Sequence, residues 1–148
     1  MDNQLFLEQL DELTKDETHL IANLANVSAF LNQILHDINW VGFYLLEDNE
    51  LILGPFQGKV ACVHIPINKG VCGYAAYLKQ TICVDDVHQF KGHIACDSQS
   101  NSEIVIPIIK NQELLGVLDI DSPVFYRFSK NDQAFLENVV EILIQNVF

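Results

Sequence analysis

The spacing of apolar residues changes twice along this chain, and that order limits the folds open to it. Apolar residues recur every three or four positions over residues 3–14 and 18–36, which predicts two amphipathic helices. Shorter apolar segments separated by turn residues follow, and a last helix is predicted from Ser129 onward. Because strands and helices do not alternate regularly, we predict an α+β fold, a mostly antiparallel sheet with helices on one face.

The strand region contains five or six short elements with irregular insertions. The predicted elements are a hairpin of residues 40–46 and 51–55, a strand at 62–67 that Pro66 places near an edge, a short helical segment at 74–78, a strand at 81–84, and a hairpin of 103–109 and 114–120. Residues 85–102 form a long polar loop. Loops of this length in a compact chain are usually functional or mobile, so this loop is a candidate site.

Length and charge narrow the class of protein. A chain of 148 residues predicts a single domain over 1–148. Its net charge of −12 argues against a nucleic-acid partner and against an anionic membrane surface. The acidic start lacks the basic region of a signal peptide, and no apolar run reaches the roughly 20 residues of a membrane span. We therefore expect a cytoplasmic protein, in which cysteines are buried, metal-binding or redox-active.

Three of the four cysteines lie in glycine-containing or polar segments. Cys96 is the strongest candidate nucleophile, because it lies in the polar loop three residues after His93, which could favour the reactive thiolate. Cys62 and Cys72 are candidate resolving thiols that would trap an oxidised Cys96 as a disulfide. The residues alone support a structural role about as well as this redox role, with Cys62 as a half-buried strand residue and Cys72 as a small residue in a tight turn. Cys83, between Ile82 and Val84, is predicted to be a core residue.

A metal site is the rival use of the same side chains. Cysteines and histidines between residues 62 and 96 supply enough soft ligands. The chain nevertheless lacks a C-x2-C pair, in which two residues separate the cysteines, and lacks histidines at zinc-finger spacing. We therefore expect neither a metal nor another cofactor.

Carboxylates form a second candidate site. Asp119 and Asp121 are two residues apart in a strand, so their side chains share one face, and Ile120 points to the opposite, core face. Like charges at this spacing are unfavourable unless a cation or a shared proton relieves them, and a ligand ammonium group would serve. Glu103 begins the neighbouring strand and could reach the same site, where one of the three could act as a general acid. Trp40, the sole tryptophan, is either a core residue or an apolar wall for a small ligand.

Taken together, these segments resemble the free methionine-(R)-sulfoxide reductases, which are built on a GAF domain. The resemblance covers residues 35–145 and rests on five motifs: WVGFY at 40–44, LGPFQGKVAC at 53–62, GVCG at 70–73, GHIACD at 92–97 followed by SEIV at 102–105, and GVLDIDSP at 116–123. It implies a GAF fold with the N- and C-terminal helices packed on one face of the sheet. It also implies that the substrate is free methionine-R-sulfoxide.

The resemblance further assigns roles to individual residues. It implies that Cys96 is the catalytic thiol and that Cys62 and Cys72 are resolving cysteines, with their order left open. The substrate-binding residues would be Trp40, Glu103, Asp119 and Asp121. A dithiol such as thioredoxin would recycle the enzyme, and a homodimer is expected. The alternative is a ligand-binding or redox-sensing GAF domain without catalysis.

Overall fold

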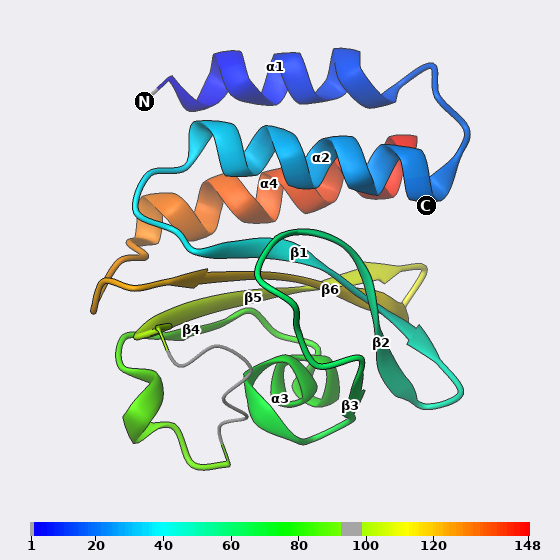
Figure 1. Cartoon of the computed structure of the whole chain (residues 1–148). Coiled ribbons are helices and arrows are strands. Elements are labelled where there is room, and N and C mark those ends of the chain that lie inside the picture. The colour runs from blue at the N-terminus through cyan, green and yellow to red at the C-terminus, as the bar shows by residue number, and fades with distance from the viewer. Residues whose placement is uncertain (1, 93–98) are drawn as a thin grey trace.

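The computed structural model describes residues 2–92 and 99–148, which form a six-stranded sheet with helices on both faces (Figure 1). Every pair of neighbouring strands is antiparallel, and the order across the sheet is β3-β2-β1-β6-β5-β4. The strands are β1 (Trp40–Glu47), β2 (Glu50–Gly58), β3 (His64–Pro66), β4 (Ile82–Val84), β5 (Ser102–Lys110) and β6 (Glu113–Ser122).

Helices from the two ends of the chain cover one face of this sheet. The helices are α1 (Asn3–Thr14), α2 (Leu20–Ile34), α3 (Gly70–Leu78), the 3-10 turn η1 (Val87–Gln89) and α4 (Lys130–Asn146). Figure 1 shows α2 and α4 against the sheet, α1 as an outer helix over them, and α3 on the opposite face. This arrangement confirms the predicted α+β fold, a mostly antiparallel sheet with the N- and C-terminal helices together on one face.

The termini of the helices follow from local capping. The Asp2 side chain accepts a hydrogen bond from the Leu5 N–H at the start of α1. Ser129 and Asp132 form a reciprocal capping box at the start of α4. This helix begins at the serine from which the sequence predicted it. Within the described residues, no helix combines the length and the apolar character needed to cross a bilayer.

Alternation along β1 divides the interior into two apolar clusters. Val41 and Phe43 point toward α1, α2 and α4, whereas Trp40 and Tyr44 point toward α3. The strands of the sheet centre are therefore buried on both faces. The functional side chains described below belong to the α3 face.

Two local predictions were wrong for identifiable reasons. The strand predicted to end at Pro55 continues to Gly58, because a shift in register between Gly42 and Tyr44 forms a bulge that accommodates the proline. Cys83 is exposed and not in the core. It lies on the edge strand β4, where the side chains of its neighbours Ile82 and Val84 point toward α3 and that of Cys83 points away.

Candidate functional site

The register of three central strands brings the predicted carboxylates together on the α3 face. Asp121 is opposite both Trp40 of β1 and Glu103 of β5. Asp119, two residues earlier, is opposite Gly42 and Val105. Ile120 points into the other apolar cluster, as the alternation predicted. Trp40, Glu103, Asp119 and Asp121 are thus neighbours on one surface of the sheet.

Helix α3 adds a thiol to these carboxylates. The Cys72 Sγ lies 3.9 Å from the Glu103 Oε2 and donates its hydrogen bond there. Cys72, Glu103 and Asp119 are only 4%, 6% and 5% exposed. One ligand atom from each of the three lies within 4.8 Å of the others, and we call this group the thiol–carboxylate cluster.

Burial dominates the ionisation of the cluster. It raises the pKa of Glu103 well above its usual range, and the nearby charges of Asp119 and Asp121 raise it further. The pKa of Asp119 is also raised by burial, against the opposing effect of hydrogen bonds from Glu103 and Cys72. Glu103 is therefore the carboxyl group that holds a proton, and Asp119 accepts from it. A group in this state can act as a general acid.

The Cys72 thiol is held in its neutral form. Burial raises its pKa well above the usual range, and the charges of Asp119, Glu103 and Asp121 act in the same direction. A reactive cysteine normally lies in an electropositive and partly exposed place, which is the reverse of this environment. Cys72 is thus a poor nucleophile while these carboxylates surround it.

One atom of the cluster has no partner. The Oδ1 of Asp119 is buried and makes no hydrogen bond within the part of the chain that the structure describes. A buried carboxylate oxygen without a partner is unfavourable by about 1–3 kcal/mol or more. The Asp119 Oδ1 can therefore accept a hydrogen bond from a ligand that carries N–H groups or a positive charge.

Aromatic side chains form the wall beside the carboxylates. The Trp40 ring stacks on Phe56, with ring centroids 5.1 Å apart, and on Tyr44 at 5.9 Å. Its Nε1 donates to the Lys59 carbonyl, and the Tyr44 hydroxyl donates to the Cys62 carbonyl. These two bonds attach the segment that carries Cys62 to the same wall.

Gly58 permits the close approach of the chain to Trp40. Its φ is +138°, and a Cβ there would lie 2.6 Å from the Trp40 Cδ1 and 2.9 Å from the Asn39 carbonyl. Both the backbone angle and the space exclude other residues without movement of the tryptophan. Gly58 thus fixes the position of the aromatic wall.

The cysteines differ in redox state. Cys62 is disulfide-bonded, whereas Cys72 and Cys83 are free thiols. The predicted nucleophile Cys96 and its neighbour His93 lie outside the described residues. The structure thus distinguishes Cys62 from Cys72, which the sequence left equivalent.

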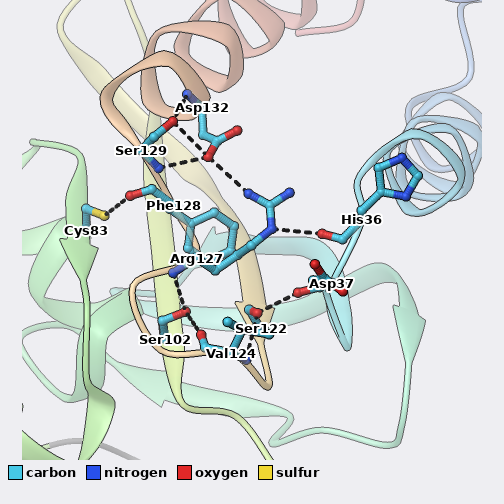
Figure 2. Close-up of polar contacts among 10 residues, drawn as sticks. All are labelled: His36, Asp37, Cys83, Ser102, Ser122, Val124, Arg127, Phe128, Ser129 and Asp132. Atoms are coloured by element: carbon cyan, nitrogen blue, oxygen red, sulfur yellow. Dashed lines mark hydrogen bonds and ion pairs between the residues drawn. The ribbon is translucent and has the colours of Figure 1, made fainter. Parts of the chain in front are cut away.

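Three residues that hold the strand ends were missed by the sequence reasoning (Figure 2). Ser102 donates to the Val124 carbonyl, and Ser122 donates to the Asp37 carbonyl. Arg127 donates from Nε to the His36 carbonyl and pairs with Asp132 at 3.0 Å. Ser102 directly precedes Glu103 and Ser122 directly follows Asp121, so this network fixes the ends of β5 and β6 that present the carboxylates. Serines at two neighbouring strand ends were the signal available in the sequence.

Of the histidines considered as metal ligands, the two in the described residues, His64 and His88, have partners outside the cluster. His64 pairs with Glu50 at 3.0 Å on the surface, and the His88 Nε2 lies 2.8 Å from the Asn101 Oδ1. In the described ranges 2–92 and 99–148, the side chains that could share a metal ion are those of the thiol–carboxylate cluster.

The chain is similar to known proteins over most of its length. A family model for the GAF domain matches residues 9–146. The free methionine-R-sulfoxide reductase of Escherichia coli K12 is 56% identical over 128 residues, which are 86% of this chain and 78% of that protein. The reduced form of fRMsr from Staphylococcus aureus is 58% identical with a TM-score of 0.96, and the match covers 99% of this chain and 96% of that one. A free methionine-R-sulfoxide reductase from Neisseria meningitidis, solved with its substrate, is 41% identical with a TM-score of 0.94, over 98% and 87% of the two chains.

Proposed function

The chain belongs to the GAF-domain family and, within it, to the free methionine-R-sulfoxide reductases, and we propose that it reduces free methionine-R-sulfoxide to methionine. The observation that carries this proposal is the buried Asp119 Oδ1 without a partner, beside Glu103 and Asp121. An α-ammonium group carries three N–H donors and a positive charge, and it would satisfy this site.

The same chemistry accounts for a preference for the free amino acid. The nitrogen of a methionine residue inside a peptide is an amide without charge, so a peptide would leave buried carboxylates uncompensated. A site built to bind a polar group rejects analogues that lack it, often by about 10⁴-fold. Trp40, stacked on Phe56, supplies an apolar wall for the thioether end of the substrate.

Reduction begins at Cys96. Its thiolate attacks the sulfoxide sulfur, and Glu103, the carboxyl group that holds a proton, protonates the sulfoxide oxygen. The oxygen is transferred to Cys96 as a sulfenic acid, and methionine leaves with a reduced sulfur.

Cys62 is the first resolving thiol in this proposal. It condenses with the Cys96 sulfenic acid, which forms a disulfide and releases water. The support for Cys62 is that it is disulfide-bonded, whereas Cys72 is a free and buried thiol whose pKa is raised. Cys72 would instead orient Glu103 through its hydrogen bond.

A dithiol protein of the thioredoxin type would complete the cycle by thiol–disulfide exchange. We further propose a cytoplasmic location, one GAF domain over residues 1–148, and a homodimer. Sedimentation equilibrium decides the last point, because a mass near the 16.7 kDa of one chain would contradict it.

The deciding experiment is consumption of the two epimers of free methionine sulfoxide, with thioredoxin and its reductase as the source of electrons. We expect loss of the R epimer alone. If neither epimer is consumed, a ligand-binding or redox-sensing GAF domain becomes the better interpretation.

Replacement of the nucleophile tests the mechanism. Cys96→Ser is expected to abolish turnover, since a serine hydroxyl neither attacks the sulfoxide efficiently nor forms a disulfide. Cys83→Ser is the matched control, because Cys83 is an exposed thiol outside the cluster, and it should keep full activity. Multiple turnovers by Cys96→Ser would refute the assignment.

A further inference from the structure

The thiol–carboxylate cluster has the donor set of a metal site. It offers one sulfur from Cys72 and one oxygen each from Glu103 and Asp119, and these atoms lie within 4.8 Å of one another. In a tetrahedral zinc site, with bonds of about 2.3 Å to sulfur and 2.0–2.2 Å to oxygen, neighbouring ligand atoms are roughly 3.3–3.7 Å apart. The three donors would need to approach one another by at most about 1 Å, and the Cys72 Sγ already lies 3.9 Å from the Glu103 Oε2.

A second observation shows that the cluster favours a cation. The Asp119 Oδ1, buried in a side chain that is 5% exposed, has no hydrogen-bond partner among the described residues. Among the described residues, the charged groups that act on Cys72 are the carboxylates of Asp119, Glu103 and Asp121. A buried group of carboxylates is stabilised by any cation that can enter it.

We propose that Cys72, Glu103 and Asp119 bind a divalent cation of borderline-soft character, of which Zn²⁺ is the physiological example. Binding displaces the protons of the Cys72 thiol and the Glu103 carboxyl group to the solvent, and the resulting thiolate favours Zn²⁺ or Cd²⁺ over Mg²⁺ and Ca²⁺, which prefer six or more oxygen atoms. Three protein ligands leave one tetrahedral position for water. The cation is an exogenous ligand here and takes no part in the reduction.

The site would exist in the oxidised protein as well. Cys72 is a free thiol while Cys62 is disulfide-bonded, so the metal ligands do not include the thiols that the catalytic cycle oxidises. The cation would occupy the carboxylates that we assign to the substrate ammonium group. Metal and free amino acid therefore exclude each other, and bound Zn²⁺ would inhibit the enzyme.

Cd²⁺ titration of the oxidised Cys83→Ser protein tests the proposal. The chain has four cysteines, so this variant with its disulfide intact keeps Cys72 as its free thiol. We expect one Cd²⁺ per chain, with the ultraviolet charge-transfer absorption of a cadmium–thiolate bond. Absence of this absorption would overturn the proposal. Mg²⁺ is the control cation and should not displace Cd²⁺.

Two variants and one competitor locate the metal. In the Cys83→Ser background, Cys72→Ser should lose the absorption, and Asp119→Asn should weaken Cd²⁺ binding by about tenfold or more, since even the outer partners of metal ligands contribute that much. Absorption that persists in Cys72→Ser would refute the site. If circular dichroism shows Cys72→Ser to be unfolded, displacement of Cd²⁺ by free methionine decides, and a failure to displace contradicts the proposal.

These readouts do not depend on turnover. A protein that binds Cd²⁺ through Cys72 but reduces neither sulfoxide epimer would contradict the proposed function alone. An active reductase without the absorption would contradict the metal site alone.

Discussion

The environment of Glu103 disfavours the charged form of its carboxyl group. Its pKa is raised by burial, by the charges of Asp119 and Asp121, and by its hydrogen bonds with both carboxyl groups. The folded state therefore keeps a proton that the unfolded chain releases at ordinary carboxyl pKa values. The free energy of unfolding then falls as the pH rises from the ordinary pKa through the raised one.

Glu103→Gln separates stability from activity at this residue. Glutamine does not ionise, so the melting temperature of the variant should exceed that of the wild type by more at about pH 8 than at about pH 5. Each kcal/mol gained would raise the melting temperature by roughly 2–4 °C in a chain of this size. Turnover should fall by about 100-fold or more, because the amide cannot supply the proton.

Thermal unfolding by circular dichroism, at both pH values, measures the stability change. Glu113→Gln is the control, because this carboxyl is exposed at the start of β6. A melting-temperature difference for Glu103→Gln that does not change with pH would show that Glu103 is already ionised in the folded protein.

At the scale of helices and strands, the spacing of apolar residues predicted those features that depend only on residues close together in the sequence. The bounds of α1 and the shared face of Asp119 and Asp121 followed from spacing alone. The approach of Cys72 to Glu103 could not be predicted, because the two residues are 31 positions apart in the sequence. Only the tertiary packing of α3 against β5 brings them together. The exposure of Cys83 was missed because alternation does not indicate which strand lies at the edge of the sheet.

The segment between β6 and α4 is held by a network that the sequence did not indicate (Figure 2). Arg127 is mostly buried and joins the segment after α2 to the start of α4, through the His36 carbonyl and Asp132. Hydrogen bonds of charged groups contribute about 1.5–3 kcal/mol each.

Arg127→Ala is therefore expected to lower the free energy of unfolding by about 1–3 kcal/mol. The Michaelis constant for the sulfoxide should rise as well, because the network fixes the strand ends next to Glu103 and Asp121. Urea denaturation measures the first effect. Lys130→Ala, an exposed cation three positions away on the chain, should change stability by less than about 0.5 kcal/mol. Equal effects of both variants would mean that the network contributes little.

At the scale of the whole molecule, charge opposes folding. The net charge of −12 arises from 20 acidic and 8 basic residues, so the folded chain concentrates negative charge. Added NaCl screens this repulsion, with a Debye length near 10 Å at 0.1 M and 3 Å at 1 M. The melting temperature should thus rise between about 0.02 and 0.5 M NaCl. A falling melting temperature would indicate that favourable ion pairs outweigh the repulsion.

The position of Trp40 has a practical consequence. It is the sole tryptophan of the chain, and its buried ring stacks on Phe56 and Tyr44 in the wall beside the carboxylates. Its emission therefore reports on this place alone. Fluorescence of the unlabelled wild-type protein, excited where tyrosine does not absorb, would follow the arrival of methionine, sulfoxide or metal in real time without any engineered probe.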